Sequence, residues 1–503
     1  MNAGDTKASE ANTLLGRMLS CPAYAVLAFA GLQCLVWTLA PALTHSAPPL
    51  DVVESYLWGR EWVVGTNKHP NLPGWILEIS RELTGAVGWP AYLVSQLFVA
   101  ATYLIVFMLG RDMMDSRRAL AGTLLLAGVF YFTWPSIEFN HNVAQMPFWA
   151  GIAWVLWRLR TRTGFGWWAL LGFVAADSLY AKLSSGLLLL IGGVWIFADP
   201  VLRRQLAKPA PWLGLLVFFV FIGPLLSWLI HTHFSPLLYA AERSSGTGEG
   251  PLQFVGAQLL ACLGLAGLAA AAGLIGPQTQ RQVAGAQPPP RVAIAFLASM
   301  TVAPVAASAL LATIAGTGLK SMWGSPMFGL AGLLMVALTS RRFGEAPLQR
   351  LAGLAVILLV ALPVGYGVDT LLESRFVGKP KRQNWPQVAI ATRFDALWHG
   401  KTSQPLRIVA GDRWVAGNAA LKAGDMPSIL TDGDLALAPW ITPDRLRRQG
   451  VLVVWELRQA SDPPPANLAP LLGTQATGIE RFTWQLFPGA QPLLIGYAIL
   501  PPA

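Results

Sequence analysis

The chain has 503 residues, of which 54% are hydrophobic and only 12% are charged, whereas about 25% of the residues in typical soluble domains are charged. Its formal net charge of +10 comes from 36 Lys and Arg against 26 Asp and Glu. The composition excludes an ordinary soluble domain and indicates a membrane protein with several transmembrane helices; in that class a basic excess is typical of cytoplasmic loops, and we expect no nucleic-acid partner.

Apolar runs long enough for transmembrane helices recur along the chain. The polar N-terminal tail contains no A-x-A cleavage site, so we expect the first run to be retained as a helix and not removed as a signal peptide. About eleven runs are predicted to span the membrane: 22–43, 89–109, 118–134, 144–158, 167–180, 184–198, 212–230, 253–275, 292–314, 326–340 and 351–371.

The fifth and sixth runs are long enough for one oversized helix or for two short helices. Basic clusters flank them at 158–162 and 203–208. Because both clusters are expected on the cytoplasmic side, we predict two short passes with an outer turn near 180–185.

Basic residues are distributed unevenly between the two sets of loops. The N-terminal tail and the loops after the even-numbered spans contain sixteen Lys and Arg, and the opposite short loops contain six. This bias predicts a cytoplasmic N-terminus and an extracytoplasmic C-terminus. The sixteen are Lys7, Arg17, Arg111, Arg117, Arg118, Arg158, Arg160, Arg162, Arg203, Arg204, Lys208, Arg281, Arg291, Arg341, Arg342 and Arg350; the six are Arg60, Lys68, Arg81, Lys182, Arg243 and Lys320.

The character of the sequence changes near residue 374, where short apolar runs alternate with turn sequences such as TDGD and SDPPP. Residues 406–410 and 451–455 are predicted to be buried strands. Residues 385–400, WPQVAIATRFDALWHG, are predicted to form an amphipathic helix. These patterns indicate a small α/β domain.

The sequence therefore predicts two domains in a mainly α polytopic membrane protein. Residues 1–373 are expected to form the transmembrane domain, and residues 374–503 a small extracytoplasmic α/β domain. Residues 284–291, AGAQPPPR, are predicted to be a cytoplasmic linker.

Polar residues outside the cytoplasmic clusters gather in the predicted outer loops. Phosphate is bound by Lys or Arg, and a carboxylate or His can abstract a proton. The loops therefore suit a substrate with an anionic head group and a lipid tail. The residues are Asp51, Glu54, Lys68, His69, Glu138, Asn140, His141, Asn142, Asp177, Tyr180, Lys182, Ser184, Ser185, His231, His233, Tyr239, Arg243, Lys320 and Trp323.

Asp51 and Glu54 are three residues apart, so they share one face if LDVVESYLWGREW is helical. An apolar stripe in this segment predicts a helix that lies in the membrane interface. The alternative is an interfacial helix whose acids merely face water. The stripe consists of Val52, Tyr56, Trp58 and Trp62.

Lys182 lies between two apolar runs, where a lysine is energetically costly and often functional. The alternative is that Lys182 extends to the lipid head groups. Arg243 and Lys320 alone would be ordinary boundary anchors. His231 and His233 could be metal ligands, but a position in an aromatic-rich membrane interface explains them equally well.

The loop motifs resemble those of GT-C membrane glycosyltransferases of families 39 and 83, which include protein O-mannosyltransferases, lipid A aminoarabinose transferases and rhizobial-type galacturonosyl transferases. In these families an acidic first outer loop precedes a His-Pro or Lys-Pro pair, and here Asp51 lies 18 residues before His69. LWGREW…KHPNLPGW is similar to the galacturonosyl-transferase branch, and AKLSSGLLLL to the family's Ala-Lys-Tyr-Ser segment. FNHNVAQMPFWAGIAWVLWR, SMWGSPMFGLAGLL and GDRWVAGNAAL are also similar, so that the resemblance covers essentially the whole chain.

The resemblance implies inverting transfer of a sugar from a polyprenyl-phosphate donor to lipid A, a lipopolysaccharide core or another glycan at the periplasmic face of the bacterial inner membrane. It implies that Asp51 is the catalytic carboxylate, with Glu54 beside it, and that Lys182, Lys68 and Arg243 bind the donor phosphate. We expect no cofactor, although the residues leave a divalent metal open. Candidates for the acceptor or sugar pocket are His69, Asn140, Asn142, Tyr239, Lys320 and Trp323.

Several positions differ from the family pattern. Many members have adjacent Asp and Glu, whereas here Val52 and Val53 separate Asp51 from Glu54, which leaves open which acid is the base. The other departures are Leu183 in place of Tyr, Asn71 in place of a second Pro, and Asn142 where relatives often have Asp.

Three other functions fit parts of the sequence. A carrier or flippase for an anionic lipid would place its key groups near the bilayer midplane, whereas here they lie toward one face. A metal-dependent lipid phosphotransferase would lose activity with a chelator. A structural subunit would tolerate Asp51→Asn and Lys182→Ala.

Overall fold

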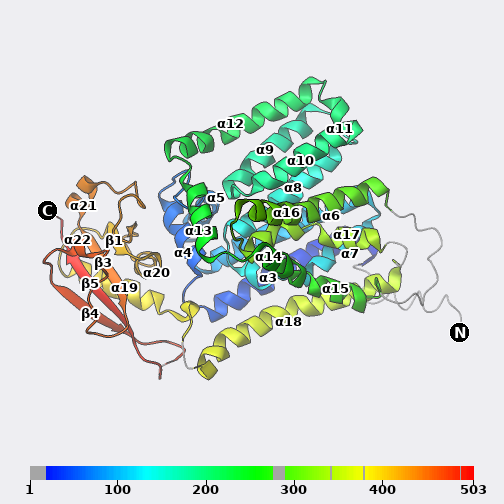
Figure 1. Ribbon diagram of the computed structural model, residues 1–503. Coiled ribbons are helices and arrows are strands. Elements are labelled where there is room, and N and C mark those ends of the chain that lie inside the picture. The colour runs from blue at the N-terminus through cyan, green and yellow to red at the C-terminus, as the bar shows by residue number, and fades with distance from the viewer. Residues whose placement is uncertain (1–18, 276–288, 340–342, 378–379, 488, 503) are drawn as a thin grey trace.

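The structure is a computed structural model that describes residues 19–275, 289–339, 343–377, 380–487 and 489–502. A body of packed helices is followed by an α/β domain that carries the sheet and the C-terminus (Figure 1). The body contains α3 (Pro22–Thr44), α4 (Leu50–Arg60), α5 (Leu72–Thr84), α6 (Trp89–Met113), α7 (Ser116–Leu124), η1 (Leu125–Gly128), η2 (Phe130–Phe132), η3 (Trp134–Ile137), α8 (His141–Arg158), α9 (Phe165–Ala181), α10 (Ser185–Ala198), α11 (Pro200–Gln205), α12 (Pro209–His231), α13 (Ser235–Thr247), α14 (Pro251–Ala261), α15 (Leu263–Ala271), α16 (Arg291–Ala315), η4 (Ser321–Phe328), α17 (Ala331–Leu338) and α18 (Glu345–Val377).

The predicted number of about eleven membrane spans is not confirmed. In the described part of the chain, six helical units are long and apolar enough to cross a membrane: α3, α6, α12, α14 with α15, α16 and α18. Two bent pairs raise the number to eight if each is counted as one span. These pairs join 116–128 to 130–137 with a bend of 87°, and 321–328 to 331–338 with a bend of 58°.

The three remaining predicted spans correspond to α8, α9 and α10. Helix α10 has 14 residues, which at 1.5 Å per residue give about 21 Å, less than the hydrocarbon thickness of about 30 Å. Most of α8 is buried inside the protein. By length and composition, these three helices do not meet the same test for a membrane span.

The predicted division of the fifth and sixth runs is confirmed. Helix α9 ends at Ala181, α10 begins at Ser185, and Lys182 has an extended backbone in the turn between them. Helix α9 also lies very close to α12, because a Cβ atom on Gly172 would be 2.0 Å from the carbonyl oxygen of Gly214. The short connection and this close approach fix where Lys182 lies.

The apolar stripe of α4, which the sequence predicted to lie in the membrane interface, is largely covered by protein. Of the predicted apolar stripe, Val52, Tyr56 and Trp58 are buried inside the protein, and Trp62, beyond the end of the helix, is half exposed. The helix packs between α5 and α20 (Arg413–Ala420). The stripe is apolar because α4 is covered by protein on both sides.

The C-terminal domain is built on a five-stranded mixed sheet with strand order β2-β1-β3-β5-β4. Strands β1 and β2 are parallel, β1 and β3 are parallel, and β5 is antiparallel to both β3 and β4. The predicted strands are present as β1 and β3, and the predicted amphipathic helix as α19. The elements are η6 (Arg382–Asn384), α19 (Gln387–His399), β1 (Ile408–Gly411), α20 (Arg413–Ala420), β2 (Ser428–Thr431), α21 (Pro443–Gln449), β3 (Val451–Leu457), α22 (Ala469–Leu472), β4 (Thr477–Phe482) and β5 (Leu493–Leu500).

The two predicted domains meet within α18, which continues past the expected boundary at 373/374 to Val377. Figure 1 places α11 at the end of the helical body that is far from the sheet, and α4 and α13 at the near end. Some residues singled out in the sequence lie outside the described part of the chain: Lys7, Arg17, Arg281, Arg341, Arg342 and residues 284–288 of the predicted linker.

Candidate active site

A cavity of about 720 Å³ lies between the near end of the helical body and the C-terminal domain. Its walls come from α4, the loop after α4, the start of α8, the α9–α10 turn, α13, η4 and α20. The structure places all of the candidate site residues from the sequence on this one cavity. They are Asp51, Glu54, Lys68, His69, Asn140, Asn142, Lys182, Tyr239, Arg243, Lys320 and Trp323.

Asp51 lies in the first turn of α4, whose N-terminal N–H groups have no partner within the helix. Its backbone N–H donates a hydrogen bond to Oε1 of Glu138, at 3.0 Å. The side-chain amide of Asn140 donates to Oδ2 of Asp51 at 3.4 Å. Asn140 is itself held as the N-cap of α8, because its Oδ1 accepts from the backbone N–H groups of Asn142 and Val143.

The pKa of Asp51 is raised to about 6, mainly by burial and further by the charge of Glu54. The positive charges of Lys182 and Arg243 and the Asn140 hydrogen bond act in the opposite direction. Burial and the nearby charge of Asp51 raise the pKa of Glu138 to about 8. A carboxylate with a pKa near 6 can accept a proton at neutral pH.

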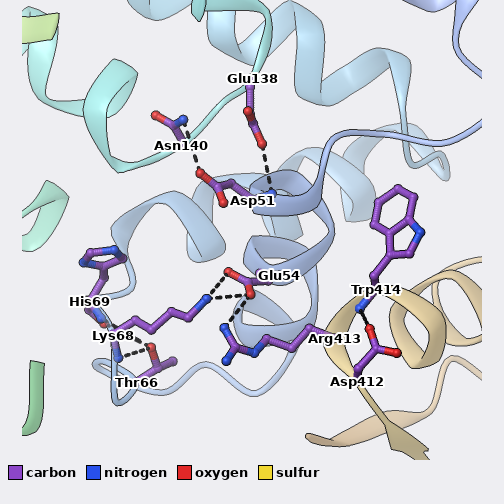
Figure 2. Close-up of polar contacts among 10 residues, drawn as sticks. All are labelled: Asp51, Glu54, Thr66, Lys68, His69, Glu138, Asn140, Asp412, Arg413 and Trp414. Atoms are coloured by element: carbon purple, nitrogen blue, oxygen red, sulfur yellow. Dashed lines mark hydrogen bonds and ion pairs between the residues drawn. The ribbon is translucent and has the colours of Figure 1, made fainter. Parts of the chain in front are cut away.

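Glu54 lies one turn further along α4 and is bound by two cations (Figure 2). Lys68 Nζ lies 2.7 Å from Oε1 and 3.0 Å from Oε2, and an Nη atom of Arg413 lies 2.8 Å from Oε1. Burial raises the pKa of Glu54, and the charge and hydrogen bond of Arg413 lower it. Asp51 and Glu54, which the sequence could not rank, therefore have different surroundings.

Lys68 is presented by a tight loop between α4 and α5. The Thr66 hydroxyl accepts from the backbone N–H groups of Lys68 at 3.3 Å and His69 at 3.4 Å (Figure 2). The ammonium group of Lys68 also lies 5.8 Å from the ring centroid of Trp58 and 5.7 Å from that of Tyr239, within the range of cation–π attraction.

Lys182 is buried, and its Nζ donates to Oδ1 of Asn142 at 2.7 Å. The same nitrogen lies 5.5 Å from the ring centroid of Trp323. Burial lowers the pKa of Lys182 to about 8, and the charge of Asp51 acts in the opposite direction. Salt bridges between Lys182 and a carboxylate are absent from the described residues, so an anion entering the cavity would meet a cation that no carboxylate neutralises directly.

Two histidines lie face to face beside these cations. The ring centroids of His69 and His141 are 4.2 Å apart, with an angle of 40° between the planes. His141 Nε2 lies 3.0 Å from the carbonyl oxygen of Pro70, where the N–H of a neutral imidazole can donate. Burial lowers the pKa of both rings, and the charge of Lys182 lowers it further, so both histidines are neutral at pH 7.

Residues 68–228 match a protein-family model described as dolichyl-phosphate-mannose-protein mannosyltransferase. The fold is similar to that of ArnT from Cupriavidus metallidurans bound to undecaprenyl phosphate, with a TM-score of 0.63 and 13% sequence identity over 94% of this chain and 97% of that chain. The apo structure of the same ArnT gives a TM-score of 0.62 at the same identity and coverage. No curated protein matches the sequence.

The chain has a GT-C glycosyltransferase fold. The resemblance that the loop motifs predicted is thereby confirmed, by the family model for 68–228 and by the fold for most of the chain. The likeness in fold covers 94% of the chain and so includes most of the C-terminal domain.

The GT-C cavity is completed by residues of the C-terminal domain that sequence reasoning did not select. They lie far along the chain from Asp51, and neither spacing nor periodicity connects them to it. One indication was present: the segment GDRWVAGNAAL, which resembled the family, contains Arg413 and Trp414. The additional lining residues from this domain are Arg382, Asp412, Arg413, Trp414 and Asp432.

One group of described residues outside the cavity has ligand atoms close enough to hold a metal ion. Asp395 and His399 on α19 and Asp425 offer atoms within 4.8 Å of one another. His399 Nε2 is already 2.9 Å from a carboxylate oxygen of Asp425, so an ion pair accounts for this cluster. His231 and His233 are not among the residues that line the cavity.

Proposed function

We propose that this protein is an inverting glycosyltransferase that moves a sugar from a polyprenyl-phosphate donor to an envelope acceptor, such as lipid A, a lipopolysaccharide core or another glycan. The observation that carries the proposal is the cavity itself, which is lined by both the partly buried carboxylate of Asp51 and the buried cation Lys182. The family model and the fold shared with an undecaprenyl-phosphate-bound ArnT support this function.

The donor phosphate is assigned to Lys182 in the α9–α10 turn and Arg243 on α13. Both residues line the cavity, and the positive charge of each lowers the pKa of Asp51. Lys68 is the third phosphate candidate, but its ammonium group already donates to both carboxylate oxygens of Glu54. We therefore assign the phosphate to Lys182 and Arg243 and place Lys68 at its edge.

Asp51 is assigned as the base and Glu54 as its neighbour. Among the described contacts, the carboxylate of Asp51 accepts one weak hydrogen bond from Asn140, whereas Glu54 is bound by two cations. A carboxylate that is paired with Lys68 and Arg413 is a poor proton acceptor, because protonation would break both ion pairs.

The transfer then follows from these positions. The acceptor hydroxyl oxygen attacks the anomeric carbon of the donor sugar, and its proton passes to Asp51. The bond from that carbon to the phosphate oxygen breaks, and its electron pair stays on the phosphate, where Lys182 and Arg243 stabilise the added negative charge. Attack from the face opposite the leaving phosphate inverts the configuration of the anomeric carbon.

The remaining cavity residues are proposed to bind the sugar and the acceptor. They offer aromatic faces, amides and a cation, which are the groups that contact hydroxyl-rich ligands through hydrogen bonds and apolar ring faces. They are His69, Asn140, Asn142, Tyr239, Lys320 and Trp323.

We place the cavity at the periplasmic face of the inner membrane. Arg203 and Arg204 belong to α11, which lies at the end of the helical body far from the C-terminal domain (Figure 1). The positive-inside rule assigns that end to the cytoplasm, and the cavity at the other end then faces outward.

The test compares the envelope glycolipids and the lipid-linked sugars of three strains by mass spectrometry: wild type, a deletion strain and a strain with Asp51→Asn. We expect the deletion and Asp51→Asn to lose the same sugar from one acceptor while the lipid-linked donor persists. Asp444→Asn is a matched control, because Asp444 is 65% exposed on α21. An unchanged glycan profile in the deletion strain, with a lipid accumulating on one leaflet, would instead identify a flippase.

A further inference from the structure

Glu54 receives one cation from each of the two domains. Lys68 belongs to the loop after α4 in the helical body, and Arg413 is the first residue of α20 in the C-terminal domain. Figure 2 shows the two side chains reaching Glu54 from different sides. A residue far along the chain thus contacts a side chain one turn away from the proposed base.

Arg413 is held firmly at the end of α20. Asp412 is the N-cap of this helix, and its Oδ1 accepts from the backbone N–H groups of Trp414 at 2.8 Å and Val415 at 3.2 Å. An N-cap of this kind fixes the first turn of a helix. The backbone of Arg413, from which its guanidinium group extends, is therefore fixed.

Helix α20 also lies against α4 without spare space. A Cβ atom on Gly417 would be 2.4 Å from Cγ1 of Val53, the residue before Glu54. The two domains also meet at the end of α4, where an Nη atom of Arg60 donates a hydrogen bond of 3.0 Å to the carbonyl oxygen of Pro427, just before β2. The close packing of α20 on α4 sets the distance between Arg413 and Glu54.

We propose that the C-terminal domain is part of the active site and that Arg413 is a positioning residue, which holds Glu54 as an ion-paired carboxylate and thereby sets the pH at which Asp51 can accept a proton. This inference rests on the proposed function and extends it to the second domain. The domain then does more than cover the cavity, because its docking determines the charge next to the base.

Asp51 and Glu54 lie in one network of charged and titratable groups. The negative charge of Glu54 raises the proton affinity of Asp51, and Arg413 places a positive charge 2.8 Å from a carboxylate oxygen of Glu54. Loss of Arg413 with Glu54 still ionised therefore makes Asp51 harder to deprotonate. The groups that act on Asp51, Glu54 or Arg413 are Glu138, Lys182, Arg243, Lys68, Tyr239 and Asp432.

The test is a cycle of four full-length proteins assayed for sugar transfer from pH 5 to pH 8: wild type, Arg413→Gln, Glu54→Gln and the double variant. We expect Arg413→Gln to move the acidic limb of the pH–rate profile upward by about 0.5 to 1 pH unit, a loss of about threefold to tenfold at low pH that diminishes at high pH. In the Glu54→Gln background the same substitution should shift the limb less, because no carboxylate at position 54 then holds the guanidinium group in place. An equal loss at every pH, independent of Glu54, would overturn the positioning role.

Two further variants separate charge from docking. Arg413→Lys keeps the positive charge, so its acidic limb should lie close to that of the wild type. Gly417→Val keeps every charge but pushes α20 away from α4, so its limb should move in the same direction as in Arg413→Gln. A wild-type limb in Gly417→Val would also overturn the inference. The control is Arg393→Gln, which removes a C-terminal-domain arginine paired with Glu480 at the surface.

Failure of the proposed function is distinguishable from failure of this inference. If wild-type protein transfers no sugar from any polyprenyl-phosphate donor, the proposed function is wrong. If wild-type protein is active but the four proteins show no coupling between Arg413 and Glu54, only the positioning role is wrong.

Discussion

The backbone N–H of Asp51 donates to a carboxyl oxygen of Glu138, a partly buried acid from the segment before α8. The N–H groups in the first turn of a helix have no partner within the helix, so Glu138 satisfies one of them at the beginning of α4. The contact also ties the proposed base to the segment that leads into α8. Glu138 thereby orients Asp51 without contributing a side chain to the cavity lining.

Replacing Glu138 separates its role as a hydrogen-bond acceptor from its role as an acid. Glu138→Gln keeps an oxygen that can accept from the Asp51 N–H, and we expect it to retain most of the transfer activity. Glu138→Ala removes the acceptor of the Asp51 N–H, at a cost of about 0.5–1.5 kcal/mol, and should lower kcat about tenfold because α4 then loses this anchor. Steady-state kinetics of both purified variants check this; equal losses would show that the acidic proton matters and not the acceptor.

The pH dependence of the reaction should show the titration of Asp51. The base must be ionised to accept a proton, and burial together with the charge of Glu54 raises its pKa to about 6. Activity should therefore be largely present above pH 7 and fall about tenfold per pH unit below pH 6. A pH–kcat/KM profile measures the limb, and Asp51→Asn, which cannot ionise, should be inactive throughout. Normal activity of Asp51→Asn would move the base to another residue.

Much of the site was predictable because outer-loop charges are rare in a membrane protein and stand out in the sequence. Lys182 between two apolar runs, and Asp51 with Glu54 at helical spacing, needed only the cost of burying a charge and the geometry of a helix.

Other features were not predictable from local patterns. The apolar stripe of α4 has the same appearance whether lipid or protein covers it, and only the tertiary fold shows that α5 and α20 do so. The number of spans is likewise not fixed by apolar runs, since a buried helix can be as apolar as a spanning one. Arg413 could not be connected to Glu54 because no sequence periodicity relates two different domains.

Lys182 is predicted to act on the donor more than on the acceptor. Lys182→Met removes the charge and keeps much of the side-chain volume, so we expect the donor KM to rise about tenfold or more while the acceptor KM changes little. Burial lowers the pKa of Lys182 to about 8, so wild-type donor kcat/KM should decline above pH 8 as the ammonium loses its proton. Lys182→Arg should remove that basic limb, because guanidinium stays charged. An unchanged donor KM in Lys182→Met would remove Lys182 from the phosphate site.

The position of α4, which carries both acids, depends on a close contact with α5. A Cβ atom on Gly59 would lie 2.0 Å from the carbonyl oxygen of Gly74, and backbone atoms cannot yield as a side chain can. Gly59→Ala should therefore destabilise the protein by about 1–3 kcal/mol and lower activity by displacing Asp51. The matched control is Gly31→Ala in α3, where a Cβ atom meets nothing within 4 Å, and where alanine should be neutral or stabilising by about 0.5–1 kcal/mol. Thermal unfolding in detergent compares the two: a Tm for Gly59→Ala as high as that for Gly31→Ala would show that α4 and α5 can separate without cost.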